Sequence, residues 1–235
     1  MKKQGSITCL KPRKWSIVSS SLKSPEREQS SEEEIANSLS HGAGLLAALV
    51  ATPPLLIRAS QQDNTGFMIG SAVFALTMIL LYLASMLYHG LPKGHRKKQF
   101  QVIEHSAIFL LIAGTYTPFT LGALRGAWGW SLLAAIWCLA AAGVILKASN
   151  RLNHPVFSTG LYILMGWLIV IAANPLWLHL PTPGLVWLAS GGLAYTVGVA
   201  FFTTDSYLRY GHFIWHLFVM AGTTCHYIAI FNYAA

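Results

Sequence analysis

Seven long runs of apolar residues constrain this chain more than any other feature of its sequence. They lie at about 41–58, 67–88, 106–124, 128–146, 157–178, 185–203 and 213–231. Each run is close to the ~20 residues that an α-helix needs to cross ~30 Å of hydrocarbon. The pattern therefore predicts an all-α fold, a seven-transmembrane helical bundle.

The composition leaves no room for a separate soluble domain, since 54% of the residues are hydrophobic and only 10% are charged. We expect residues 1–30, which are polar and lack hydrophobic periodicity, to form a disordered cytoplasmic tail. Residues 31–235 would then form the seven-helix transmembrane domain. Ser31 and Glu34 fit a capping box at the start of the first helix, and Pro175 is expected to break the fifth span.

The positive charge of the chain indicates topology rather than nucleic-acid binding. The formal net charge is +8, but 14 of the 16 Lys and Arg residues fall in the tail or in loops on one side of the predicted bundle. Arg58 and Arg125 are the exceptions. The positive-inside rule then places the N-terminus in the cytoplasm and the C-terminus outside. Three scattered cysteines without a CxxC pair argue against both a disulfide framework and a cysteine-based zinc site.

The strongest chemical signal is a pair of histidines at the start of the last span. His212 and His216 are four residues apart, which places both imidazoles on one face of a helix, where one metal ion could bind both. The alternative to metal binding is that both are ordinary polar residues, hydrogen-bonded at a helix end. His226 lies about 15 Å further along the same helix, too far away to bind the same ion.

The predicted topology brings further polar groups to the same layer. Ionisable residues within membrane spans are costly and therefore indicate function. Three histidines with an open fourth position would form a catalytic type of zinc site, in which a carboxylate could hold or deprotonate the zinc-bound water. The groups expected in this layer are His41, Ser85, His89, Glu104 and Asp205. Of these, Ser85 could hydrogen-bond the water or a substrate carbonyl.

Four segments resemble the bacterial hemolysin III proteins, within the progestin and adipoQ receptor family that includes the adiponectin receptors. They are EEIANSLSHGAG (33–44), SMLYHGLP (85–92), EHSAIFLLIAGTYTPFTL (104–121) and GHFIWHLFVMAGTTCH (211–226). The resemblance implies a seven-helix protein of the bacterial inner membrane, with its N-terminus inside and a zinc ion near the cytoplasmic face.

The resemblance also implies residue roles. It carries zinc ligation onto His89, His212 and His216, and it places Ser85 beside these ligands. Glu104 takes the acidic position near the zinc-bound water, where the family usually has the shorter Asp. Asp205 and His41 are candidate hydrogen-bond partners for the ligand rings.

Three functions remain open at this stage. The first is zinc-dependent intramembrane hydrolysis of lipid amides or esters, which relatives such as the alkaline ceramidases suggest. The second is a receptor-like protein or a sensor of membrane homeostasis with structural zinc. The third is a cytolytic pore, which rests on the family name alone, because no polar stripe follows the spans. Membrane lipids are the expected environment and candidate substrate. A lipid-sized cavity reaching the zinc would favour the hydrolase, whereas a closed four-ligand site would favour structural zinc.

Overall fold

The computed structural model describes residues 27–235 apart from 125, 153 and 154, and without the side chain of Pro155. The described residues form helices and no strand. Seven helical segments are long and apolar enough to cross a membrane. This confirms the predicted all-α, seven-transmembrane class. Residues 1–26 of the predicted tail lie outside the described residues.

The helices follow one another through short connections. In chain order they are α1 (Ser31–Ser60), α2 (Thr65–Gly90), α3 (His95–Leu121), α4 (Ala127–Ala148), α5 (Pro155–Trp167), the 3₁₀ helix η1 (Leu168–Ala172), α6 (Ala173–His179), α7 (Thr182–Thr203) and α8 (Gly211–Tyr233).

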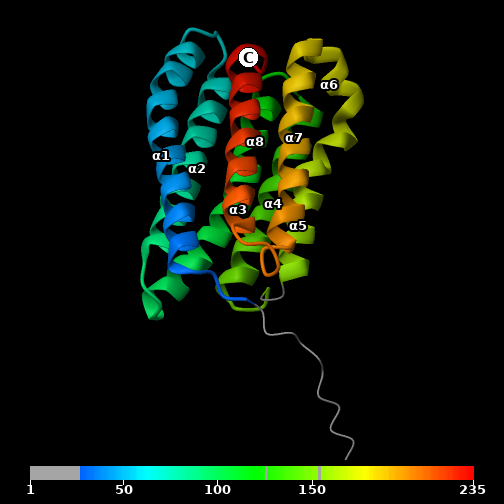
Figure 1. Cartoon of the computed structure of the whole chain (residues 1–235). Coiled ribbons are helices and arrows are strands. Elements are labelled where there is room, and N and C mark those ends of the chain that lie inside the picture. The colour runs from blue at the N-terminus through cyan, green and yellow to red at the C-terminus, as the bar shows by residue number, and fades with distance from the viewer. Residues whose placement is uncertain (1–26, 125, 153–154) are drawn as a thin grey trace, which may run out of the picture.

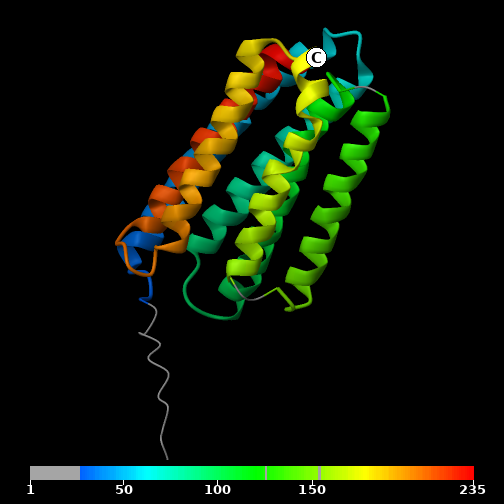
Figure 2. The ribbon, with the colours of Figure 1, turned by 90° about the vertical axis from the view of Figure 1, so that its right-hand side faces the viewer.

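The helices run side by side along the long axis of the bundle (Figure 1). Helix α1 packs against α2 and α8, α7 packs against α8, and α3 packs against α2, α4 and α5. The α2–α3 and α7–α8 connections lie at the same end of the bundle as the start of α1, and the C-terminus lies at the opposite end (Figures 1 and 2). We call the first of these the N-terminal end. The end of α2 and the starts of α1, α3 and α8 therefore meet there.

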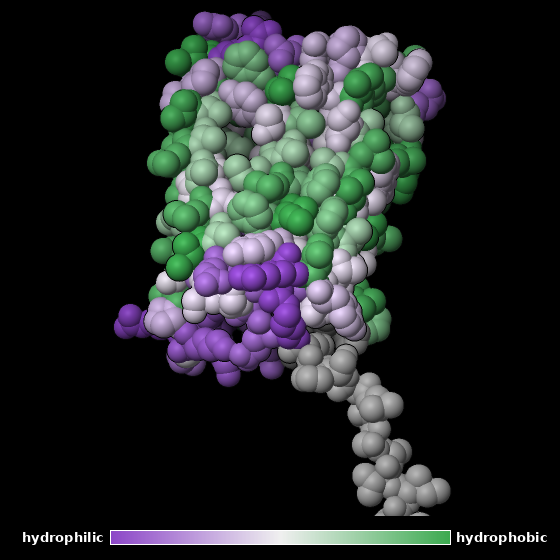
Figure 3. All heavy atoms as spheres, in the orientation of Figure 1, coloured by the Kyte–Doolittle hydropathy of each residue, from purple (hydrophilic) through white to green (hydrophobic). Residues whose placement is uncertain are grey.

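The surface suits a bilayer. On the face that Figure 3 shows, apolar side chains cover the middle of the molecule and polar side chains gather at both ends. Large apolar side chains point outward on several helices, including Leu46, Val50 and Val186, which are 66%, 76% and 57% exposed. Exposed apolar side chains are unfavourable in water but not in lipid, so the surface supports the assignment as an integral membrane protein.

The first helix begins one residue earlier than the sequence predicts. Ser30 is the N-cap, its hydroxyl accepts from the Glu33 amide, and the Glu33 carboxylate accepts from the Ser30 amide. The predicted Ser31–Glu34 pairing is wrong because the Glu33 carboxylate is also bound by Arg27 and by the Tyr210 amide. These contacts select one of two overlapping S-x-x-E patterns.

The fifth span breaks earlier than predicted. The α-helical hydrogen bonding gives way at η1, between Trp167 and Ala173, and Pro175 lies within the first turn of α6. A proline is tolerated in the first turn of a helix, whereas its ring would clash with the carbonyl four residues earlier, here Ile171. The irregular segment therefore lies upstream of the proline.

Helices α2 and α3 approach each other closely because glycines line their contact. A Cβ atom at Gly70 would lie 2.6 Å from Pro118 Cα, and one at Gly114 would lie 2.1 Å from Thr77 Oγ1. Only hydrogen fits at such positions, as is usual where helices pack tightly in membranes. This contact fixes the end of α2 beside the first turns of α3.

Candidate metal centre

Four side chains from three helices converge at the N-terminal end of the bundle. His89 lies in the last turn of α2, Glu104 lies in the third turn of α3, and His212 and His216 occupy the first two turns of α8. Each offers one ligand atom, and these atoms all lie within 4.8 Å of one another. His89, Glu104 and His216 are buried, and His212 is half-buried.

The three imidazoles surround a common point. Their ring centroids are 5.0 Å apart for His89–His212, 5.0 Å for His89–His216 and 4.8 Å for His212–His216. The planes of each pair cross at 58–69°. Three rings that approach one point from different directions suit a tetrahedral ion with one further position.

Two carboxylates orient two of these rings through the Nδ1 atom. His89 Nδ1 lies 2.8 Å from Glu34 Oε2, and His212 Nδ1 lies 3.1 Å from Asp205 Oδ2. Lys97 Nζ lies 3.0 Å from Glu34 Oε2, so the carboxylate has a second partner. Contacts of this kind fix the tautomer and the direction of a metal-binding histidine.

Helix α1 orients the third ring. His216 Nδ1 lies 3.0 Å from Ser40 Oγ and 3.2 Å from the Asn37 carbonyl oxygen. In all three rings the Nδ1 atom thus contacts a protein group, and Nε2 is left to bind an ion. His89 Nε2 is buried without a hydrogen-bond partner among the described residues. An unpaired buried nitrogen is unfavourable unless something binds it, so the donor set fits a divalent ion such as zinc.

Glu104 lies at the edge of the three rings. Ser85 donates a hydrogen bond of 2.6 Å to Glu104 Oε1, and that oxygen lies 3.5 Å from His89 Nε2. Glu104 Oε2 lies 4.0 Å from His105 Nε2. The carboxylate is therefore close enough either to bind an ion itself or to hold a water beside it.

The N-terminal segment links α1 to the loop before α8. Arg27 forms an ion pair of 2.6 Å with Glu33, which raises the pKa of the Arg27 guanidinium, and it also donates to the carbonyl oxygens of Asp205 and Leu208. Tyr210 precedes α8 with φ = 60°, a left-handed conformation that non-glycine residues seldom adopt. Its amide donates to Glu33 Oε1 at 2.8 Å. These contacts position the start of α8 and its histidines.

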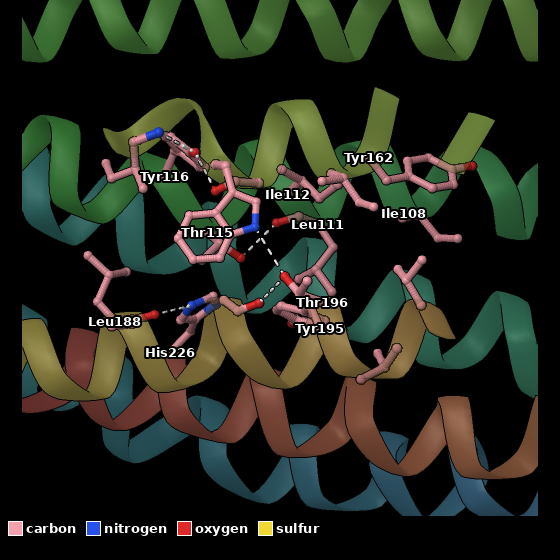
Figure 4. Close-up of a pocket in the computed structure, with 18 of the residues that line it drawn as sticks. Ile108, Leu111, Ile112, Thr115, Tyr116, Tyr162, Leu188, Tyr195, Thr196 and His226 are labelled. Carbon is pink, nitrogen blue, oxygen red and sulfur yellow. Dashed lines mark hydrogen bonds between the residues drawn. The ribbon is translucent and has the colours of Figure 1, made fainter. Parts of the chain in front are cut away.

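Two cavities meet at this cluster. A largely apolar cavity of about 350 Å³ runs among α3, α5, η1, α6, α7 and α8, and reaches Glu104 and His216 at one end. A more polar cavity of about 700 Å³ reaches His89, His212 and Asp205 from the N-terminal end of the bundle. Figure 4 shows the apolar cavity, into which side chains such as Ile108, Leu111 and Leu188 project.

The structure separates the predicted residues into groups with different contacts. His89, Glu104, His212 and His216 come together, Ser85 bonds Glu104, and Asp205 bonds His212. His41 does not hydrogen-bond a ligand ring as expected; its imidazole stacks on His216 instead. His226 lies outside the cluster and contacts the Leu188 carbonyl oxygen.

Sequence reasoning missed three contacts from α1, made by Glu34, Asn37 and Ser40. Residues 34, 37 and 40 recur every three positions and therefore lie on one side of the helix. Three polar residues on one face of a membrane helix indicate a buried polar interface. That pattern could have identified them, but the sequence had suggested a capping role for Glu34.

The chain is similar in sequence to known bacterial proteins. The family model described as Haemolysin-III related matches residues 29–227. Hemolysin-3 from Bacillus cereus is 43% identical over 202 residues, which cover 86% of this chain and 92% of that protein. The Hemolysin-3 homolog of Bacillus subtilis (strain 168) is 38% identical over 202 residues, covering 86% of this chain and 94% of that protein.

A more distant relative extends the similarity to animals. The human monocyte to macrophage differentiation factor is 31% identical over 213 residues, which cover 86% of this chain and 84% of that protein. No solved structure matches the chain.

Proposed function

Because the chain belongs to the Haemolysin-III related family, we propose that it is a zinc-dependent hydrolase of the bacterial inner membrane. His89, His212 and His216 would hold the zinc ion, and the substrate would be a membrane lipid with an amide or ester bond. Zinc is the ion proposed because three imidazoles with an open fourth position are its usual catalytic arrangement.

The observation that carries this proposal is the junction between the histidine cluster and the apolar cavity. The cavity reaches Glu104 and His216 at one end and is otherwise lined mainly by apolar side chains. An acyl chain could occupy it while the polar part of the lipid lies at the cluster. The polar cavity on the other side of the cluster would admit water and release a polar product.

The chain's own residues supply a proton acceptor. When bound, zinc lowers the pKa of its water ligand towards 7. The Ser85 hydroxyl holds Glu104 Oε1 at 2.6 Å, whereas Oε2 is beyond hydrogen-bond distance of His105. Oε1 is also the oxygen that lies 3.5 Å from His89 Nε2, and it keeps a second lone pair with which to accept a proton from the attacking water. Ser85 would keep the carboxylate in the orientation that this transfer needs.

The test is to measure zinc and lipid hydrolysis in the same purified protein. We expect about one zinc per chain, little zinc after His216→Ala, and unchanged zinc after His226→Ala, because His226 lies outside the cluster. Glu104→Gln should keep the zinc and abolish release of fatty acid from a bacterial lipid extract. Wild-type protein without zinc, or Glu104→Gln protein with full hydrolysis, would refute the proposal.

A structural zinc site in a receptor-like or sensor protein is the second candidate. It is favoured by the position of Glu104, whose ligand atom lies within 4.8 Å of those of the three histidines. If the carboxylate occupies the fourth position, the site is closed to water. Glu104→Gln would then lower zinc content as much as His216→Ala, and the wild type would release no fatty acid. Cytolysis rests on the names of relatives and stays a prediction.

We also propose that the N-terminal end of the bundle, and with it the metal centre, faces the cytoplasm. The support is the excess of Lys and Arg in the loops at that end. In a variant lacking the native cysteines, Lys97→Cys should resist an impermeant thiol reagent in intact cells and react after permeabilisation. Labelling in intact cells would reverse the orientation.

A further inference from the structure

His41 is a buried histidine that belongs neither to the metal group nor to any hydrogen bond of the described residues. It lies on α1 and is 3% exposed. Its ring stacks on His216, with centroids 3.6 Å apart and planes 8° from parallel, and the Tyr82 ring contacts it edge-on at 5.1 Å. The group of potential metal ligands does not contain it.

Both ring nitrogens of His41 lack a partner. Nδ1 and Nε2 are each buried without a hydrogen bond within the described part of the chain. Most buried polar side-chain atoms in folded proteins are paired, because an unpaired one loses its hydration without compensation. The neighbouring ring of His216 illustrates the difference, since its Nδ1 contacts Ser40 and Asn37. An unpaired imidazole of this kind indicates a hydrogen-bond partner that the protein itself does not supply.

The apolar cavity gives that partner a place. His41 lines it near the end formed by Glu104 and His216, and no other residue of α1 contributes to its described wall. Nearby wall residues such as Leu81 and Ile108 cannot form side-chain hydrogen bonds. A ligand in this cavity would therefore find few polar side chains close to the metal centre, and His41 is one of them.

We propose that His41 binds the carbonyl group of the lipid substrate by a hydrogen bond, and so selects lipids with an amide or ester linkage over plain hydrocarbon. A neutral imidazole has one donor and one acceptor nitrogen, and its N–H can donate to a carbonyl oxygen. Stacking on His216 holds the ring beside the metal centre, so the bound carbonyl would lie next to Glu104. The inference rests on the proposed function in taking the ligand to be a lipid with such a linkage.

The test measures ligand preference without turnover. Zinc-loaded protein in detergent is titrated with a medium-chain fatty amide and with the alkane of the same length. Each competes with a brominated fatty amide that quenches tryptophan fluorescence, including that of Trp215 in the cavity wall. His41→Phe keeps an aromatic ring and removes both nitrogens. It should weaken amide binding about tenfold, the loss of one hydrogen bond, and leave alkane binding unchanged.

Thr115→Val is the matched control. Thr115 also lines the cavity, but its hydroxyl already donates to the Leu111 carbonyl oxygen at 2.8 Å. Its replacement should leave the affinity for both probes unchanged. If His41→Phe lowers zinc content, His41→Gln tests the hydrogen bond instead. The amide side chain of Gln retains a donor and should preserve most of the preference for the fatty amide over the alkane.

Unchanged amide affinity in His41→Phe, or an equal loss for amide and alkane, would overturn the inference. Failure of the hydrolase proposal looks different. A wild-type protein that binds the fatty amide through His41 but releases no fatty acid from lipids would leave the binding role intact and remove the enzyme. Conversely, normal hydrolysis together with unchanged amide binding in His41→Phe would remove only the role of His41.

Discussion

Replacing Glu34 should weaken zinc binding although Glu34 is not one of the proposed ligands. Its Oε2 atom lies 2.8 Å from His89 Nδ1, and it is the only described carboxylate oxygen paired with that nitrogen. Loss of such an outer partner typically lowers metal affinity 10- to 100-fold, or about 1.4–2.7 kcal/mol. Glu34→Gln keeps an acceptor oxygen but removes the charge, so its effect should be near tenfold. Glu34→Ala removes both and should approach a hundredfold.

The assay is competition with a zinc chelator at constant pH, on protein in detergent. Glu28→Gln is the control, because Glu28 also lines the polar cavity but pairs with the exposed Lys93 and contacts no histidine of the cluster. Its zinc affinity should equal that of the wild type. The reasoning fails if Glu34→Ala retains wild-type affinity, or if Glu28→Gln loses as much affinity as Glu34→Gln.

Two further predictions concern stability. Gly114→Ala should destabilise the protein by about 1–3 kcal/mol, because the new Cβ would lie 2.1 Å from Thr77 Oγ1. Gly160→Ala is the control and should leave stability unchanged, because its Cβ would meet nothing within 4 Å. Equal midpoints of the two variants in chemical denaturation would contradict the prediction. Arg27→Ala should lower the midpoint of denaturation, since it removes a hydrogen-bonded partner from the buried Glu33 carboxylate, although exposure of Arg27 to solvent weakens the pair. The same denaturation measurement checks it, and an unchanged midpoint would show that the ion pair contributes nothing.

Much of the fold could be predicted from local sequence. A run of about 20 apolar residues has few stable options other than a membrane-spanning helix, because only internal hydrogen bonds satisfy its backbone in lipid. The spans defined the all-α bundle and its topology. That topology in turn placed His89 and Glu104 at the same level as the His212–His216 pair, and the structure brings these four side chains together.

The errors arose where one local signal had two solutions. Ser30 and Ser31 both begin an S-x-x-E pattern, and only the contacts of Glu33 with Arg27 and Tyr210 distinguish them. The break in the fifth span was assigned to Pro175, whereas the irregular backbone lies before it in η1. In both cases the prediction identified the feature but misplaced it by one or more residues along the chain.

The sequence by itself determined which segments cross the membrane and which histidines share a helix face, because hydrophobic run length and the 3.6-residue period are local properties. Only the tertiary structure decided what each ring nitrogen contacts. The partner of His89 is 55 residues away in the chain, and the partners of His216 are more than 170 residues away. Such pairings depend on how α1 packs against α2 and α8, and the side-chain pattern of one helix does not specify them. The same packing stacked His41 on His216, left its nitrogens without a hydrogen bond among the described residues and opened the apolar cavity beside the histidine cluster.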